Sequence, residues 1–109
     1  MKKTVGPSET RIMMHVLAQL QDKFPDGLWE RRNVIAVDTG HGFVRANKKG
    51  TADISGCYRG RYVELEIKVP GGIQSKAQRS RQEQVELAGG VYSVVTCWAM
   101  AKEVVEGIR

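Results

Sequence analysis

The chain has few cysteines and no long hydrophobic run, and each absence excludes a class of protein. Its two cysteines, Cys57 and Cys97, lie far apart without a Cys-x-x-Cys or Cys/His cluster, so neither a zinc site nor a disulfide framework is predicted. We expect both to be small buried residues in a reducing compartment. No apolar run approaches the roughly 20 residues that cross a bilayer, and no signal-type hydrophobic segment follows the N-terminal lysines. The sequence therefore predicts a soluble cytoplasmic protein, of a bacterium or a phage-infected cell, without a membrane partner.

Internal repeats and low-complexity segments are also missing. A length of 109 residues leaves room for one domain, residues 1–109, with one modest core. Lys and Arg outnumber Asp and Glu by 17 to 12, which gives a formal net charge of +5. This balance favours a polyanionic partner, although it also suits a ribosomal or membrane-surface protein. Charge alone therefore indicates what the protein binds and not what it does.

Apolar spacing and turn residues predict seven elements in the order α-β-β-β-α-β-α. The first helix begins after the N-cap Ser8, carries an apolar stripe at helical spacing and ends near Phe24. A basic glycine-containing loop is expected over residues 38–50, and Arg59-Gly60 reads as a tight hairpin turn. The other predicted elements are strands over 28–37, 52–58, 61–69 and 91–96 and helices over 75–88 and 98–107, the last with core candidates Trp98, Met100, Ala101, Val104 and Val105. This order predicts a single α/β domain with a central mixed sheet.

Acidic residues mark the two strands on either side of this hairpin. Residues of a strand alternate between its faces, so Glu64, Glu66 and Lys68 share one side while apolar residues occupy the other. Counting back from a two-residue turn places Asp53 opposite Glu66, with about 4.5–5.5 Å between their Cβ atoms. Two carboxylates so close destabilise a sheet unless a positive charge separates them. The pattern therefore indicates either an accidental acidic patch or a site for a divalent cation.

Five sequence features occur in a characteristic order: Gly50-x-x-Asp53, Glu66-x-Lys68, Pro70-Gly71-Gly72, Ser75-x-x-Gln78 and Gly89-Gly90. Together they resemble the virus-type replication-repair nuclease (VRR-NUC) family of the PD-(D/E)xK nuclease superfamily. The resemblance covers residues 9–95 and implies a restriction-endonuclease-like α/β fold. One departure is mild, because Ala52 stands where the family usually has proline before the acid.

The resemblance also implies the parts of a catalytic site. Asp53 and Glu66, with Glu9 on the first helix and the backbone carbonyl of Ile67, would hold Mg²⁺ or Mn²⁺ through oxygen ligands. Lys68 would position or deprotonate the water that attacks phosphorus.

Two members of this set also have plainer explanations. Glu9 could serve only the helix dipole in the first turn of its helix. Gln78, which borders the metal site in the family, could be an ordinary solvated glutamine. Glu64 shares the face of Glu66 and could support the site, although the family motif does not require it.

Cations near these acids are the candidate contacts to DNA phosphates. Either they clamp the nucleic-acid backbone or they are solvated surface charges. His41 could contact DNA, whereas His15 has no partner at metal-ligand spacing. The predicted DNA-binding residues are Arg45, Lys48, Lys49, Arg59, Arg61, Lys76, Arg79 and Arg81.

These features predict a metal-dependent, structure-selective DNA endonuclease that needs no small-molecule cofactor. Stand-alone members of the family resemble phage resolvases, so we expect a homodimeric Holliday junction resolvase whose two-fold axis places two active sites on one four-way junction. The alternatives are a flap or nicking endonuclease of DNA repair and a basic nucleic-acid-binding protein without activity.

Overall fold

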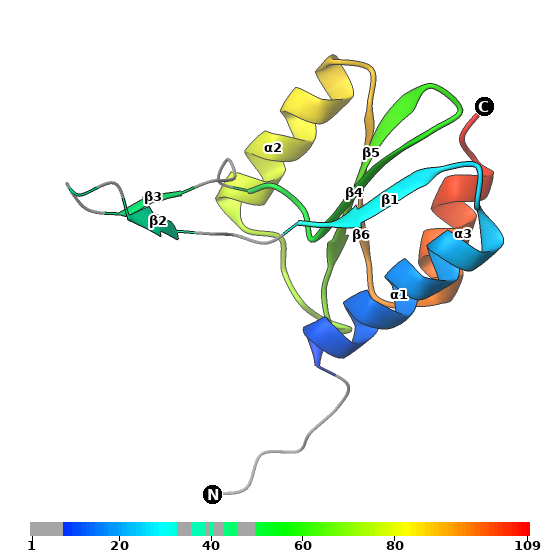
Figure 1. Ribbon diagram of the computed structural model, residues 1–109, viewed down its shortest axis with the longest axis horizontal. Coiled ribbons are helices and arrows are strands. Elements are labelled where there is room, and N and C mark those ends of the chain that lie inside the picture. The colour runs from blue at the N-terminus through cyan, green and yellow to red at the C-terminus, as the bar shows by residue number, and fades with distance from the viewer. Residues whose placement is uncertain (1–7, 33–35, 39, 41–42, 46–49) are drawn as a thin grey trace, which may run out of the picture.

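The computed structural model describes residues 8–32, 36–38, 40, 43–45 and 50–109. In chain order the elements are α1 (Glu9–Lys23), β1 (Leu28–Arg31), β2 (Ala36–Asp38), β3 (Phe43–Arg45), β4 (Ile54–Tyr58), β5 (Arg61–Ile67), α2 (Lys76–Leu87), β6 (Val91–Val95) and α3 (Trp98–Glu106). Figure 1 shows their arrangement, with α1 and α3 on one face of the main sheet and α2 on the other.

The main sheet is mixed and has the strand order β1-β4-β5-β6. Strands β1, β4 and β5 pair antiparallel, whereas β6 runs parallel to β5 and is reached through α2. Strands β2 and β3 form a separate two-stranded antiparallel sheet, which projects away from the main sheet (Figure 1). The predicted α/β class with a central mixed sheet is confirmed.

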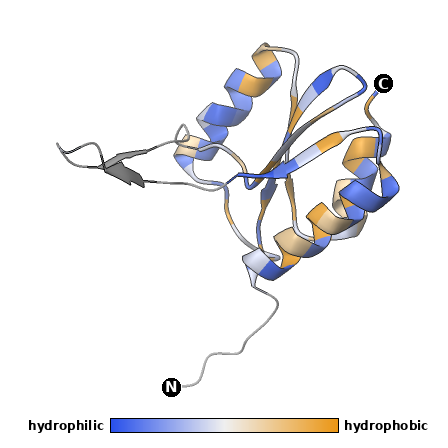
Figure 2. Ribbon diagram, viewed as in Figure 1, coloured by the Kyte–Doolittle hydropathy of each residue, from blue (hydrophilic) through white to orange (hydrophobic). Residues whose placement is uncertain are grey.

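Helix α1 follows its sequence closely. Ser8 caps it by accepting a hydrogen bond of 3.1 Å from the Arg11 N–H, which satisfies one of the free donors of the first turn. Its apolar stripe buries Met13, Val16 and Leu20 against the sheet. In Figure 2 the ribbons of α1 and α3 carry many residues coloured as hydrophobic, whereas α2 is mostly hydrophilic. The main core therefore lies between the sheet and the α1–α3 pair.

The β4–β5 hairpin has the predicted turn and register. Arg59 and Gly60 have φ angles of 53° and 80°, as a type I′ turn requires at both central residues. Ile54 pairs with Leu65, so the next pair outward is Asp53 with Glu66, as counted from the sequence. The alternation of β5 is also confirmed, because its apolar residues Val63, Leu65 and Ile67 all enter the main core.

Helix α2 is capped at both ends, by side chains at its N-terminus and by backbone hydrogen bonds at its C-terminus. Ser75 and Gln78 form a reciprocal capping box at its N-terminus. At the C-terminus the N–H groups of Gly89 and Gly90 donate to the carbonyls of Glu86 and Val85, the pattern of a Schellman motif, and Gly89 has a φ of 91°. Ser75 is therefore the N-cap of α2, and Gly89 and Gly90 end the helix.

The prediction of one strand over 28–37 was wrong, and so was that of a continuous loop over 38–50. Strand β1 ends at Arg31, which pairs with Ile54, the first residue of β4. Beyond this point the backbone N–H of Arg32 donates to the Asp53 carbonyl, and the Arg32 side chain donates to the Ser55 hydroxyl. The chain then forms β2 and β3, with Asp38 paired to Phe43, which adds two strands to the predicted order.

Three predicted core positions are exposed. Cys57 and Cys97 are both free and exposed, and Met100 is 40% exposed. Cys57 lies on the α2 side of β4, whose apolar side is the opposite one, and Cys97 is the N-cap of α3. Ala101 and Val105 of α3 are buried as predicted. Among the described residues, no helix is long and apolar enough to cross a membrane.

Candidate metal centre

Asp53 and Glu66 meet where β4 separates from β5. The register places them side by side on the α2 face of the sheet, and the Asp53 carboxylate accepts a hydrogen bond of 2.8 Å from the Ile67 backbone N–H. Asp53 therefore replaces a backbone partner for β5 at the end of the ladder. This bond fixes the Asp53 carboxylate beside the Glu66 side chain.

The environment of Glu66 disfavours a charged carboxylate. It is only 5% exposed, and burial, followed by the charge of Asp53, raises its pKa to about 8, while the charge of Lys68 opposes the rise. A hydrogen bond with Asp53 and the charge of Glu9 add to the rise. Near neutral pH the raised pKa favours the protonated form of Glu66, and a cation that displaces this proton would relieve the repulsion between the two acids.

Lys68 supplies the third group of the predicted motif. Its Nζ lies 3.9 Å from Glu66 Oε2, and the two side chains are 16% and 7% exposed. The short spacing of Glu66 and Lys68 on one face of the chain makes this pair possible. A partly buried ammonium beside two carboxylates can hold a water molecule or a phosphate oxygen at the same place.

A backbone oxygen also lies on the edge of β5 next to Asp53. The N–H and C=O of a strand residue lie on the same edge, and the Ile67 N–H is directed at Asp53. The Ile67 carbonyl therefore lies on the edge of β5 that faces Asp53. Two carboxylates and one carbonyl form an all-oxygen donor set of the kind that Mg²⁺ and Mn²⁺ prefer, so the described residues fit such an ion.

Glu9 does not complete this set as the sequence suggested. It is exposed in the first turn of α1, although its charge still raises the pKa of Glu66. Within the described ranges, no group of three His, Cys, Asp or Glu residues is placed to hold a metal. The structure brings Asp53 and Glu66 together and leaves Glu9 at the edge of the site.

Gln78 has a structural task that sequence reasoning missed. Its side-chain oxygen accepts a hydrogen bond of 2.8 Å from the Ser75 N–H, while the Ser75 hydroxyl accepts one of 3.1 Å from the Gln78 N–H. The Ser75-x-x-Gln78 spacing is the recognised sequence signal for this capping box. The structure therefore shows Gln78 closing the start of α2, a task beside the two considered from sequence.

Glu64 is the most enclosed charged residue of the described chain. It is completely buried, and its carboxylate accepts hydrogen bonds from Arg81, Tyr62 and the Ala52 N–H. Burial alone would raise the pKa of Glu64, but these hydrogen bonds outweigh it and hold the pKa below its ordinary value. Arg81, predicted to bind DNA, is thus ion-paired with Glu64 at 2.5 Å, and its side chain is only 20% exposed.

The other predicted DNA contacts fall into three groups. Lys76 and Arg79 are exposed at the start of α2. Arg59 and Arg61 lie at the hairpin turn, and at about 3.3 Å per residue Arg61 is roughly 16 Å along β5 from Glu66, so the fold does not bring them to the acids. The side chain of Arg45 lies outside the described residues, as do Lys48, Lys49 and His41. His15 is exposed on α1, as expected.

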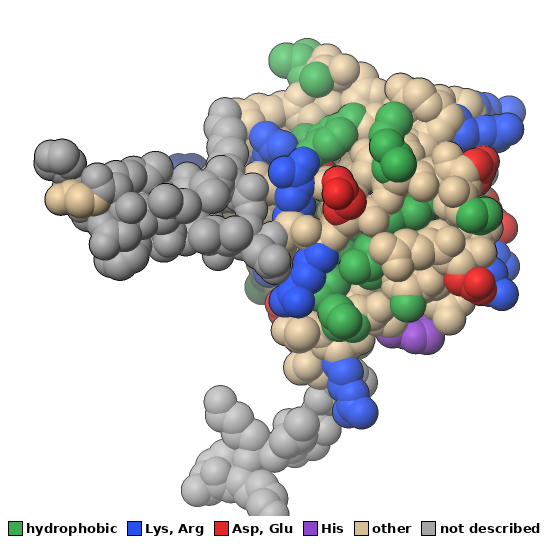
Figure 3. Space-filling model, viewed as in Figure 1, with side chains coloured by type: hydrophobic (Ala, Val, Ile, Leu, Met, Phe, Trp, Pro, Cys, Tyr) green, Lys and Arg blue, Asp and Glu red, His purple; other side chains and the backbone are tan. Residues whose placement is uncertain are grey.

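Two neighbours of the site were not singled out from sequence. Arg32 is exposed, and its Nε donates to the buried Ser55 hydroxyl at 2.6 Å. Tyr92 of β6 is buried opposite Glu64, and burial, with the charges of Glu66, Glu64 and Asp53, raises its pKa. Figure 3 shows Lys and Arg side chains in a band from α2 toward the start of α1, with an acidic side chain nearby.

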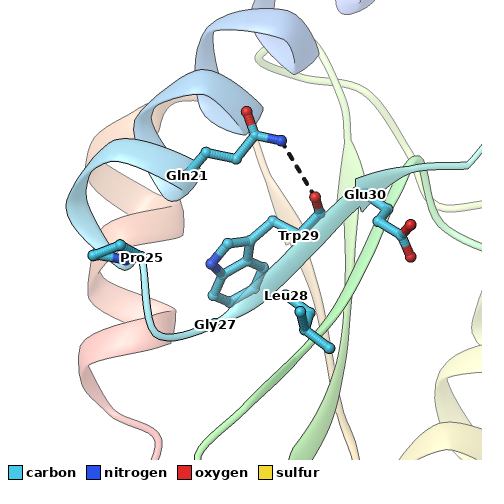
Figure 4. A pocket seen from close by; sticks show the side chains of 6 residues that line it. All are labelled: Gln21, Pro25, Gly27, Leu28, Trp29 and Glu30. Carbon is cyan, nitrogen blue, oxygen red and sulfur yellow. Dashed lines mark hydrogen bonds between the residues drawn. The ribbon is translucent and has the colours of Figure 1, made fainter.

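Two surface hollows among the described residues lie away from the acids. One, of about 410 Å³, follows the outer edge of β1, where the Gln21 side chain donates to the Trp29 carbonyl at 3.3 Å (Figure 4). The other, of about 500 Å³, lies between the starts of α1 and α3 and includes His15, Pro70 and Trp98. Neither of these two hollows is lined by Asp53 or Glu66.

Comparison with known proteins adds no relative to this description. No protein-family model matches the chain, and a search of curated proteins finds no match. The interpretation of the site therefore depends on the sequence motifs and on the geometry around Asp53 and Glu66.

Proposed function

We propose that the protein is a Mg²⁺- or Mn²⁺-dependent DNA endonuclease with the restriction-endonuclease-like fold of the PD-(D/E)xK nucleases, similar to the VRR-NUC family. One observation supports this function above the others. Asp53 and Glu66 are held together at the β4–β5 fork, with Glu66 almost fully buried and Lys68 within 3.9 Å of it. A fold gains nothing from burying an acid beside another acid, so the arrangement is explained better by a bound cation.

Each residue has a distinct task in this proposal. Asp53, Glu66 and the Ile67 carbonyl hold the ion, with Glu9 able to approach from α1. The bound ion supplies Lewis acidity, which lowers the pKa of a water molecule and stabilises charge on the phosphate. Lys68 would position the attacking water, or donate a hydrogen bond to a phosphate oxygen, and the exposed Lys76 and Arg79 would neutralise neighbouring phosphates.

A four-way DNA junction is the proposed substrate, cut by a homodimer. The net charge of +5 favours DNA, and a two-fold dimer places two such sites on symmetric strands. Flap or nicking endonuclease activity is the second candidate. Binding without cleavage is the third, and it is favoured by one observation: the described part of the chain assembles two carboxylates and not three.

Cleavage of synthetic junction, flap and linear duplex DNA tests the proposal, with Mg²⁺, Mn²⁺ or EDTA. Wild type is compared with Asp53→Ala and Glu66→Gln, and with the control Asp22→Asn, whose side chain is 70% exposed in a surface ion pair. We expect metal-dependent symmetric cuts on the junction, lost in both site variants and retained in the control, with DNA binding preserved throughout. Cuts on flaps or duplex alone would favour the second candidate.

Loss of binding together with cleavage in Asp53→Ala would show that Asp53 and Glu66 are a structural pair. Tight DNA binding by wild type without cleavage of any substrate would leave the non-catalytic candidate.

A further inference from the structure

Glu64 makes contacts that reach beyond an ordinary ion pair. Its Oε1 accepts a hydrogen bond of 3.2 Å from the Ala52 backbone N–H, and both its oxygens accept from the Arg81 guanidinium. Ala52 immediately precedes Asp53. The buried acid of β5 is therefore bonded to the backbone next to the first candidate metal ligand.

The β4–β5 fork explains why this bond matters. In the hairpin register Ala52 stands opposite Ile67, where an antiparallel ladder would continue with backbone bonds between the two. Instead the Ala52 N–H donates to Glu64 and the Ile67 N–H donates to Asp53. Two acidic side chains thus replace the ladder at the point where the strands separate.

Other elements hold the same segment in place. A Cβ on Gly50, whose φ is 87°, would lie 2.3 Å from the Ala77 carbonyl oxygen and 3.1 Å from Arg81 Cβ, so the chain here presses against α2. The Tyr92 hydroxyl of β6 donates to the Gly50 carbonyl at 3.4 Å. The segment that delivers Asp53 is therefore clamped between α2, β5 and β6.

We infer that Glu64 is a positioning residue: through the Ala52 N–H it sets where the Asp53 carboxylate stands relative to Glu66, and the hydrogen bonds from Arg81 hold Glu64 in place. The effect of Glu64 on metal affinity rests on the proposed function. The effect of Glu64 on the position of Asp53 does not depend on it. The competing explanation is that Glu64 and Arg81 only fasten α2 to the sheet.

A matched pair of double variants separates the two explanations. Glu64→Met with Arg81→Met removes the ion pair without leaving an unpaired buried charge, a change that is often neutral for stability, and it also removes the acceptor for Ala52. Glu64→Gln with Arg81→Met removes the ion pair but keeps an amide oxygen for Ala52. Tyr62 is 37% exposed, so its hydroxyl can bond to water in both.

Two measurements are made on each variant. The first is hydrogen exchange of the Ile67 amide in metal-free protein, which reports directly on the Asp53 carboxylate. The second is Mn²⁺ affinity by calorimetry. We expect the Met/Met variant to lose the Ile67 protection and to bind Mn²⁺ at least tenfold more weakly than the Gln/Met variant, as seen when ligand-orienting groups are removed.

Equal Ile67 exchange in the two double variants would overturn the positioning role. A failure of wild type to bind Mn²⁺ would instead overturn the proposed function, while Ile67 exchange still decides the role of Glu64. Should the Met/Met variant not fold, Glu64→Gln alone serves. Its acceptor is intact and Arg81 reaches solvent, so a tenfold loss of Mn²⁺ affinity there would also contradict the inference.

Discussion

The two faces of strand β5 use the same backbone for opposite purposes. Val63, Leu65 and Ile67 are fully buried among other apolar side chains of α1, α3 and the sheet. Glu64 and Glu66, between them in the sequence, are also buried but face α2. The apolar face is held by non-directional burial, whereas the acidic face depends on particular hydrogen bonds.

This difference has a consequence for what each face can be used for. On the apolar face one residue can be exchanged for another of similar shape at modest cost. On the acidic face Glu64 has every partner that it needs, and the pKa of Glu66 is raised because it is buried and because its neighbour is another acid. A strand that buries both kinds of carboxylate can be stable and still hold one group ready for a ligand.

Leu65→Ala should produce the largest loss of stability, because it opens a cavity in the fully buried face of β5. We expect the free energy of unfolding to fall by roughly 2–5 kcal/mol, measured by urea denaturation. Met14→Ala, at a side chain that is 52% exposed, is the control and should change it by less than about 1 kcal/mol. Similar losses at both positions would contradict the assignment of this face to the core.

In contrast, Glu66→Gln should stabilise the metal-free protein at alkaline pH. The folded pKa, about 8, lies above the ordinary value of 4.5, so the contribution of the Glu66 proton to stability is complete below pH 4.5 and is lost as the pH rises through 8. Wild type should therefore lose roughly 2–4 kcal/mol between these limits, at about 1.4 kcal/mol for each tenfold change in proton activity. The variant should lack most of this loss.

Unfolding curves from pH 5 to pH 8.5 in EDTA measure the effect. Glu106→Gln is the control, because this exposed residue forms only a surface pair with Lys102 at 4.0 Å, and it should keep the wild-type pH dependence. A wild-type protein with flat stability across this range would show that the acids at the fork do not repel each other.

The apolar face of β5 could be predicted from the sequence more fully than the partners of its acidic face. Local rules determine the apolar face, the I′ turn and the caps of α1 and α2, so the register that pairs Asp53 with Glu66 could be counted from residues 59 and 60 alone. Side-chain partners that come from elements distant in the sequence could not be identified in this way. Nothing near Arg81 in the sequence shows that it reaches Glu64, 17 positions away, and the end of β1 is set by where β4 begins.

Glycines offer a test of the clamp on the acidic face. Gly50 and Gly71 have nearly the same φ, 87° and 86°, but a Cβ on Gly50 would meet the Ala77 carbonyl at 2.3 Å while nothing lies within 4 Å of one on Gly71. Gly71→Ala should cost only the left-handed backbone strain, roughly 1–2 kcal/mol. Gly50→Ala should cost more and should also weaken Mn²⁺ binding, because the segment leading to Asp53 must move.

Thermal unfolding and Mn²⁺ calorimetry on both variants decide this comparison. Equal destabilisation would mean that the contact of Gly50 with α2 yields easily. Unchanged Mn²⁺ affinity in Gly50→Ala would show that the position of Asp53 does not depend on this segment.

The smallest expected effect is at Gln78, where the sequence resemblance and the structure suggest different tasks. As a member of the capping box with Ser75, Gln78 should contribute about 0.5–1 kcal/mol of stability, which Gln78→Ala removes. Gln78→Glu should keep both stability and cleavage, because a glutamate at this position accepts the same bond from the Ser75 N–H. The exposed Gln84, replaced by alanine, controls for loss of a glutamine elsewhere on α2.

If Gln78→Glu keeps its thermal stability but loses cleavage tenfold or more, the amide acts at the metal centre and the capping role is not its only one. Because Gln78→Glu keeps the capping acceptor but removes the amide, whereas Gln78→Ala removes both, stability and cleavage measured together separate the two tasks of this side chain.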